Sequence, residues 1–292
     1  MIGVTAPIDP ALQNAQNSGY EGESAIDSDR LCFAHGCHRR YWANNIVLSE
    51  WNLGPGGYPL SEQKILQELR KYNTPSITNV VATYPDRPYC LGLYNPWREN
   101  WYTDQSLRCM FPELGRTVGY AVTCVFGLSD PDFKRLSMGN LLEALEASRK
   151  PSILVFQQKF PPEIAGKVGL AGGVMTTLLK AVGCVGAISN GPSRDIDEIR
   201  EMNFQYLISG ITAGHGTMAL RAVNVPVSIA GMDVSPGEIV HMDEHGACKF
   251  PADKLGAVSE NLRAMEVDER KFLKQIQNAK TVSEMIGVLP KY

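Results

Sequence analysis

The chain has 292 residues, a formal net charge of −3 and a pI of about 6.0. Hydrophobic residues make up 44% of it, enough for a sizeable core in one large domain or in one domain with an extension. It contains no basic block and no basic stripe interleaved with aromatic residues, which argues against nucleic-acid binding. No apolar run approaches a membrane span, and the first residues lack the pattern of a secretory signal. We therefore expect a cytoplasmic protein.

Residues 1–59 are predicted to form an N-terminal extension or wrapping arm, because the first part is polar and aperiodic. Cys32, His35, Cys37 and His38 follow close together and raise the question of a zinc site. Their spacing is not that of a structural zinc site, and no second pair of ligands follows at the distance found in zinc fingers. We interpret this aromatic-rich segment as a packed cover over another surface.

The seven cysteines are scattered and odd in number, which does not indicate a disulfide framework in a chain of this length. Cys124 and Cys184 lie inside apolar, strand-like runs. Cysteine in such a place behaves as a small hydrophobic residue, so we expect both thiols to be reduced and buried.

The main domain is predicted to occupy residues 60–292. Ser61–Tyr72 has apolar residues at helical spacing behind a capping serine, which predicts an amphipathic helix ended by Thr74-Pro75. A second helix is predicted to begin within Ser76–Thr83. The next segment, Tyr84–Leu114, has no sustained period and is interpreted as an irregular insertion. Its aromatic side chains either line a pocket for a bulky substrate or, as we favour, fill a subunit interface.

The rest of the domain alternates short strands with short helices and then becomes mostly β. Strands are predicted at Thr117–Phe126, where apolar residues alternate, and at Ser152–Phe156, Val185–Ser189, Gln205–Ser209, Val225–Ala230 and Glu238–Met242. Helices are predicted at Asn140–Ser148, Val174–Val182, Asp197–Met202 and within Ala252–Ile286. This order predicts a layered α/β domain rather than a barrel.

The stretch from Gly169 to Asp195 is the strongest candidate for a functional site. A glycine-rich turn opens a short helix that Gly183 ends, and after a buried strand a second turn presents Arg194 and Asp195 side by side. A helix N-terminus offers unpaired N–H groups, arginine binds carboxylates, and aspartate is a hard ligand for Mg²⁺ or Mn²⁺. Together these groups would hold an α-keto acid. The alternative is a simple tight turn with a surface ion pair.

Three histidines are further candidates for a functional role. His215 lies between glycines on a predicted loop, where it would serve as a general acid or base; with no visible partner, we prefer a loop residue that hydrogen-bonds to backbone. His241 and His245 flank Met242-Asp243-Glu244, a pattern that invites a metal-site interpretation.

The stretch from Gly172 through Gly183, Gly186 and Gly191 to Arg194-Asp195 resembles the RraA-like family signature without a gap. A second match follows at Asn224–Pro251, and the resemblance as a whole covers roughly Leu60–Val288. The family includes regulators of ribonuclease activity and divalent-metal 4-hydroxy-4-methyl-2-oxoglutarate aldolases that also decarboxylate oxaloacetate. It implies a layered β/β/α, swivelling-domain-like α/β fold in a single domain, and places His241 and His245 at a β-turn.

The resemblance also implies a site and a chemistry. Mg²⁺ or Mn²⁺ held by Asp195, partly through water, would stabilise the pyruvate enolate left when a carbon–carbon bond breaks. A helical glutamate from a neighbouring subunit would complete the site, with Glu269 at the matching position, Asp268 as the choice if the alignment slips by one, and a solvated helical charge as the alternative. The implied assembly is a homotrimer or hexamer. The groups implied to hold the substrate are Arg194 and the N–H groups of Gly172, Gly173, Val174 and Met175.

One departure bears on function. Aldolases of the family carry an acidic residue directly after the first glycine of the turn, and this chain has Gly173 there. Losing that carboxylate is expected to weaken metal binding and proton transfer. Three functions follow: a metal-dependent aldolase or decarboxylase, a repurposed lyase or isomerase acting on a larger acid, and a non-catalytic protein of the ribonuclease-regulator type.

Overall fold

The computed structural model describes residues 60–84, 87–132 and 136–289. By its internal contacts the chain divides into two units, Met1–Leu48 and Ser49–Tyr292, and everything below concerns the second. The predictions made for residues 1–59, including the histidine and cysteine group at 32–38, lie outside the described residues.

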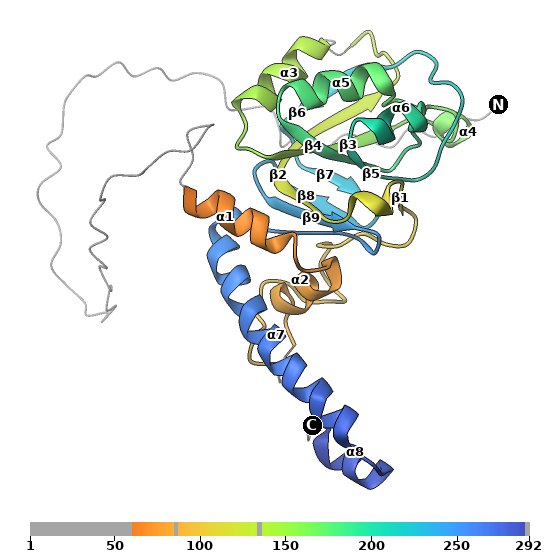
Figure 1. Cartoon of the computed structure of the whole chain (residues 1–292). Helices are drawn as coiled ribbons and strands as arrows, with labels where there is room; N and C mark the ends of the chain where they lie inside the picture. The colour runs from red at the N-terminus through yellow and green to blue at the C-terminus, as the bar shows by residue number, and fades with distance from the viewer. Residues whose placement is uncertain (1–59, 85–86, 133–135, 290–292) are drawn as a thin grey trace, which may run out of the picture. The chain divides into compact units, whose positions relative to one another are not determined.

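A mixed sheet of eight strands forms the centre of this unit (Figure 1). Strands β2, β3, β4 and β5 run parallel to one another, and β1, β6, β9 and β10 add antiparallel neighbours. Their bounds are β1 Arg108–Cys109, β2 Thr117–Gly127, β3 Ser152–Lys159, β4 Cys184–Ser189, β5 Gln205–Ile208, β6 Ala219–Val223, β9 Ile239–Asp243 and β10 Gly246–Phe250.

Strand β2 is the centre of the sheet. It pairs along its length with β3, and on its other edge with β9 at its start and β6 at its end. All its residues are buried. The prediction of a strand was therefore confirmed, but its apolar alternation does not mark a half-exposed strand, since both faces of β2 are covered.

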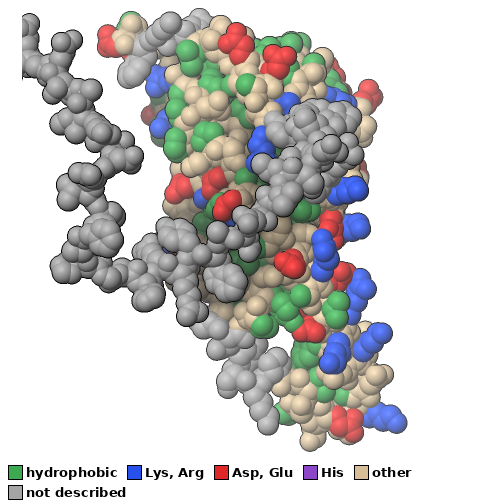
Figure 2. All heavy atoms as spheres, turned by 90° about the vertical axis from the view of Figure 1, so that its left-hand side faces the viewer, with side chains coloured by type: hydrophobic (Ala, Val, Ile, Leu, Met, Phe, Trp, Pro, Cys, Tyr) green, Lys and Arg blue, Asp and Glu red, His purple; other side chains and the backbone are tan. Residues whose placement is uncertain are grey.

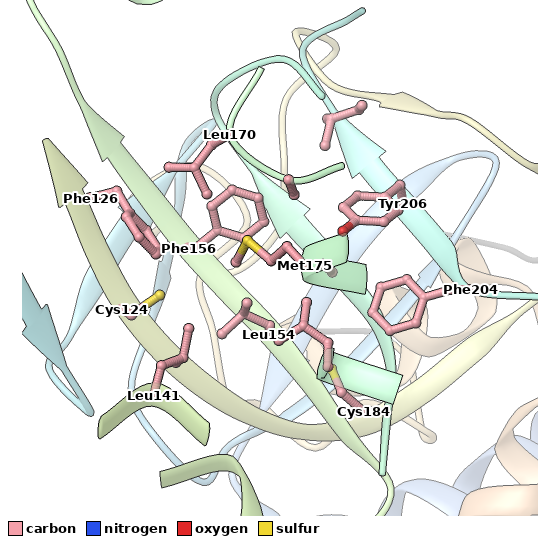
Figure 3. Packing of buried hydrophobic residues seen from close by; sticks show 14 of the residues in the cluster. Cys124, Phe126, Leu141, Leu154, Phe156, Leu170, Met175, Cys184, Phe204 and Tyr206 are labelled. Carbon is pink, nitrogen blue, oxygen red and sulfur yellow. The ribbon is translucent and has the colours of Figure 1, made fainter. Parts of the chain in front are cut away.

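Helices cover one face of the sheet and a small second sheet covers the other. The helices are α3 Met138–Ala147, α4 Pro162–Ala165, α5 Gly173–Ala181 and α6 Ile196–Glu201. Buried side chains of α3, α5 and α6 pack on β2 and β3 in a core that includes Leu141, Met175, Leu154 and Phe156, together with Cys124 and Cys184 (Figure 3). On the opposite face, strands β7 (Val227–Ile229) and β8 (Met232–Val234) enclose a second apolar cluster. The predicted mixed, layered α/β fold and the buried thiols are confirmed.

A third apolar cluster lies between the sheet and three helices, two near the start of the domain and one near its end. It contains α1 Leu60–Leu69, α2 Thr74–Val81 and the first half of α7 Leu255–Asn278, which is followed by α8 Val282–Val288. Two predicted boundaries were wrong. Ser61 lies inside α1 rather than at its cap, and Pro75 lies in the first turn of α2, where a missing N–H costs nothing.

The predicted insertion is irregular, as expected, and some of its aromatics are core residues. Trp101 is 1% exposed, stacks on Tyr94 with ring centroids 5.5 Å apart, and packs in the same cluster as α2 and β10. These two rings therefore belong to the core of their own chain. Trp97, in contrast, is 88% exposed, and a substrate pocket or a subunit interface for the exposed aromatics stays a prediction.

Among the helices that the structure describes, none combines the length and apolar character needed to cross a bilayer.

Candidate functional site

Three loops leave the carboxyl ends of the parallel strands β3, β4 and β5 and meet at the N-terminus of α5. Main-chain hydrogen bonds join them: the N–H of Arg194 donates to the carbonyl of Ala171 (3.3 Å), Gly169 to Gly214 (2.8 Å) and Ser193 to Gly210 (3.0 Å). Ligands of open α/β sheets bind outside the carboxyl ends of the strands. The two turns predicted to lie close together are thus in contact at the expected end of the sheet.

Asp195 reaches from one loop to the helix of the other. Its φ of 55° places it in the left-handed region, which Asp tolerates better than most residues, and its side chain does not cap α6, the helix that it precedes. Instead Oδ2 accepts the N–H of Gly173 at 3.0 Å, at the N-terminus of α5. An uncommon backbone conformation that turns a carboxylate towards another helix is the kind of feature found at functional sites.

Arg194 forms an ion pair with this carboxylate. Its Nε is buried, lies 3.5 Å from Asp195 Oδ2 and makes no hydrogen bond within the described part of the chain. Both side chains are 34% exposed, so they lie at a mouth rather than on the open surface. The two terminal nitrogens of the guanidinium have no hydrogen-bond partner among the described residues and remain as donors, and the choice between a ligand site and a simple ion pair stays a prediction.

The backbone donors predicted at the helix start are only partly available. The N–H of Gly173 is engaged by Asp195. Val174 and Met175, at the next two positions of the helix, have N–H groups with no partner among the described residues. These two amides remain as donors to an anion, and the positive end of the α5 dipole adds to their effect.

Both glycines of the turn have a carboxylate close to where a Cβ would lie. A Cβ at Gly172 would overlap Asp195 Oδ2, and a Cβ at Gly173 would overlap Glu198 Oε2. Glu198 therefore places a carboxylate where a side chain at position 173 would begin. Glu198 was not predicted from the sequence, although it lies three residues after Asp195, in the first turn of the helix that Asp195 precedes.

A pocket of about 230 Å³ opens beside these groups. Arg194 and His215 are its polar side chains. His215 Nδ1 donates to the carbonyl of Gly216 at 2.6 Å, which confirms the expected hydrogen bond to backbone. The complete lining is Phe126, Met138, Leu170, Gly172, Val174, Met175, Leu178, Arg194, His215 and Met218.

Glu269 does not join this site within one chain. It is exposed on α7, which packs against α1 and α2, on the opposite side of the sheet from α5 (Figure 1). Figure 2 shows exposed charged side chains over the same helix. Asp268, the alternative by one residue, accepts a hydrogen bond from Tyr89 Oη. Of the two carboxylates, Glu269 is thus the one with no side-chain partner among the described residues.

His241 and His245 belong to a different structure, the hairpin between β9 and β10. His241 is fully buried: its Nδ1 accepts from the hydroxyl of Thr74 at 2.9 Å and its Nε2 donates to the carbonyl of Leu69 at 3.3 Å. Burial lowers the pKa of His241 to about 4. Burial tends to raise the pKa of Asp243, but hydrogen bonds from the N–H groups of Thr74 and His245 and the nearby His241 outweigh it, so the pKa lies below its usual range. The β-turn interpretation is confirmed.

A larger pocket, of about 450 Å³, lies at the other end of the parallel strands. Residues at the starts of β2, β4 and β5 line it, among them Thr117, Val185 and Gln205, with Arg70 as its one charged side chain. No carboxylate is paired with that cation, whereas Arg194 at the smaller pocket has Asp195 Oδ2 3.5 Å from its Nε, so we take the smaller pocket as the candidate site.

The donors at the mouth suit a hydrated divalent cation better than a tightly enclosed one. Within the described residues no group of three or more His, Cys, Asp or Glu side chains is placed to hold a metal. Mg²⁺ commonly binds through one or two carboxylates and keeps several waters. Asp195 Oδ1 has no protein partner among the described residues, and Glu198 Oε2 lies beside Gly173 of the same turn. Asp195, Glu198 and water therefore fit such an ion.

The layered sheet and the loops at its carboxyl edge define a mixed α/β fold of the RraA-like type. The sequence model of the RraA-like family, described as Aldolase/RraA, matches residues 95–248. The chain belongs to this family.

Individual relatives are distant. One is a protein of Halalkalibacterium halodurans named "Putative 4-hydroxy-4-methyl-2-oxoglutarate aldolase", 26% identical over 101 residues, which are 34% of this chain and 48% of that protein. The chain spans between 17% and 57% of the length of the curated relatives that it matches.

Two solved structures show the same fold. An uncharacterized protein from Pseudomonas syringae gives a TM-score of 0.60 at 21% identity, covering 84% of this chain and 99% of that one. RraAS2 from Streptomyces coelicolor, described as an unusual member of the RNase ES inhibitor RraA protein family, gives 0.55 at 19% identity, covering 73% and 98%.

Proposed function

We propose that the protein is a divalent-metal-dependent carbon–carbon lyase that acts on an α-keto acid and releases pyruvate, by retro-aldol cleavage or by oxaloacetate-type decarboxylation. The observation that carries this proposal is the meeting of Arg194, Asp195 and two free N–H groups at the start of α5. A cation, an anion and oriented amide donors within one mouth are the groups needed to hold a keto carboxylate while negative charge develops on its oxygen.

The cation of choice is Mg²⁺ or Mn²⁺. Asp195 would hold it through Oδ1, and Glu198 would accept hydrogen bonds from its water shell in place of the acidic side chain that position 173 lacks. When bound, such an ion polarises the keto group and stabilises an adjacent enolate. The family membership and the name of the H. halodurans relative support this choice.

The chain's own groups then have separate tasks. The guanidinium of Arg194 presents a planar fork to the substrate carboxylate and fixes its orientation. The N–H groups of Val174 and Met175 face the same mouth and donate to an oxygen that gains charge. Asp195 keeps its own geometry through the N–H of Gly173, so the carboxylate is positioned before any ligand arrives.

We further propose that the working form is a homo-oligomer, a trimer or a hexamer, in which Glu269 of one subunit faces the mouth of the next. Glu269 lies on the far part of α7, beyond the part that packs into its own core, and it is exposed there. Dissociation of the oligomer would then lower activity without unfolding the subunit.

The test is pyruvate release from oxaloacetate and from 4-hydroxy-4-methyl-2-oxoglutarate, with Mg²⁺ and with an added chelator. Arg194→Ala is expected to lower the rate at least about a hundredfold. Arg200→Ala is the matched control, because Arg200 is exposed and pairs with Glu113 on the surface. A rate that ignores both the chelator and Arg194→Ala would contradict the proposal.

A further inference from the structure

The pocket beside Arg194 is apolar beyond its mouth. Arg194 is its one formally charged side chain, His215 its one other polar side chain, and no carboxylate, lysine or second arginine lines it. Seven of its ten lining residues are hydrophobic: Phe126, Met138, Leu170, Val174, Met175, Leu178 and Met218. A ligand gripped by Arg194 at one end therefore meets hydrocarbon and thioether groups at the other.

The apolar surface continues past this pocket. A second hollow, of about 440 Å³, shares Phe126, Met138 and Met218 with the first and adds Leu220 of β6. Figure 3 shows Phe126, Leu170 and Met175 in the buried cluster that lies beneath this surface. The three methionines that contribute are flexible and polarizable, and such side chains adapt to ligands of varied shape.

We propose that the substrate is an α-keto acid whose C4 carries an apolar arm, aromatic or branched aliphatic, in place of a second carboxylate. This inference rests on the lyase function proposed above and names the substrate class of the same site. A second carboxylate in the pocket would lose its water and find no cation besides the one already used. An apolar arm gains free energy when it leaves water for the same surface.

The inference also gives His215 a task. Because Nδ1 donates to the carbonyl of Gly216, the neutral ring leaves Nε2 as an acceptor. A 4-hydroxy-2-oxo acid carries its hydroxyl on C4, where the arm begins. The O–H proton passes to Nε2, a C=O bond forms at C4, and the C3–C4 bond breaks. Its electron pair becomes the pyruvate enolate, which takes a proton at C3, so the products are pyruvate and an apolar aldehyde or ketone, and no other reactant is needed.

Two keto acids that differ only in the group on C4 test the substrate class. 2-Oxo-4-phenylbutanoate has a phenyl arm and 2-oxoglutarate a carboxylate, and neither has the hydroxyl needed for cleavage, so both report binding alone. Affinities are measured calorimetrically on the full chain with Mg²⁺, with pyruvate as the arm-free reference. We expect 2-oxo-4-phenylbutanoate to bind at least about tenfold more tightly than 2-oxoglutarate.

If the apolar pocket causes the preference for the phenyl compound, a cation introduced into the pocket should reverse that preference. Met218→Arg introduces a cation at the junction of the two hollows and is expected to favour 2-oxoglutarate over the phenyl compound. Trp97→Arg introduces the same charge at a side chain that is 88% exposed and lines neither hollow, and it should leave the preference unchanged.

The outcomes distinguish a wrong substrate class from a wrong lyase function. If pyruvate binds with Mg²⁺ but 2-oxoglutarate binds as tightly as the phenyl compound, the substrate class is wrong and the lyase proposal stands. If no keto acid binds, the lyase proposal fails as well. If the phenyl arm adds nothing while Met218→Arg changes the mass of the assembly, a second copy of the chain covers this surface and the inference is overturned.

Discussion

Two polar clusters in this domain differ in burial and in hydrogen bonding, and we assign a functional role to only one of them. The buried cluster, formed by Thr74, His241 and Asp243, has residues no more than 4% exposed, and each is hydrogen-bonded. The site cluster, formed by Arg194, Asp195 and Glu198, is partly open to solvent, and Asp195 Oδ1 has no hydrogen-bond partner among the described residues. Fully satisfied polar groups hold a fold together, whereas unsatisfied ones at a mouth are available to a ligand.

The largest effect is expected at the site cluster and on activity alone. Asp195→Asn should lower the rate of pyruvate release by about a hundred- to a thousandfold, because it removes the charge that we propose to hold the cation. Thermal unfolding should move by less than about 4 °C, since one partly exposed hydrogen bond is worth about 1 kcal/mol. Asp197→Asn, an exposed neighbour, is the control; an active, cation-dependent Asp195→Asn enzyme would remove Asp195 from the site.

The buried cluster should show the opposite behaviour. Asp243→Ala leaves the N–H groups of Thr74 and His245 without their acceptor and should lower the free energy of unfolding by about 3 kcal/mol. Urea denaturation measures this loss, and the rate per folded molecule should stay near that of the parent. Glu244→Ala removes the exposed carboxylate next in sequence and should cost little. Equal losses in the two variants would show that burial of Asp243 does not matter.

Moving the carboxylate from position 198 to position 173 tests the role of Glu198 in the site cluster. Glu198→Gln should weaken Mn²⁺ binding by about tenfold, as is usual when a carboxylate around a metal is lost. Gly173→Asp in that background should restore the affinity, because the space beside residue 173 then holds a carboxylate again. Calorimetric titration with Mn²⁺ measures both. Gly173→Asp in the parent is the comparison, since there Glu198 must move aside first; the absence of rescue would contradict the proposed role of Glu198.

The smallest effect is a pH dependence that belongs to the buried cluster. His241 has a pKa of about 4 when folded and about 6.5 when unfolded, so the unfolded chain binds more protons as the pH falls. Stability contributed by neutral His241 is present above pH 6.5 and decreases as the pH falls towards 4. Between pH 7 and 5.5 the loss should be about 1 kcal/mol. His241→Gln should remove this dependence and the half-exposed His245→Gln should retain it, as thermal unfolding at several pH values will show.

Local signals predicted the central stretch well. The helix expected at Val174–Val182 is Gly173–Ala181, and the strand expected at Val185–Ser189 is Cys184–Ser189. Glycines and short apolar runs fix such elements without help from the rest of the chain. Strand β6 was missed because its run of residues is short and pairs with β2 across an irregular register, a partnership that exists only in the folded sheet.

The candidate site, too, was predictable only where its residues lie close together in sequence. Arg194 and Asp195 were predictable, since the strand and helix between the two turns are short enough to bring both turns to one edge. The apolar pocket was not, because Phe126, Met138 and Met218 come from β2, α3 and the loop before β6. Side chains from segments so far apart in sequence meet only through the sheet order, which no local pattern encodes.

The three loops at the mouth are joined through main-chain atoms, from Ala171 to Arg194 and from Gly169 to Gly214. Substitutions of side chains on these loops should therefore displace the main chain little. A library that varies Val174, Leu178 and Met218 while keeping the glycines, Arg194 and Asp195 should yield enzymes that differ in the acceptor aldehyde or ketone they join to pyruvate in the synthetic direction. On the lyase function proposed above, the domain would therefore serve as a scaffold for making new carbon–carbon bonds.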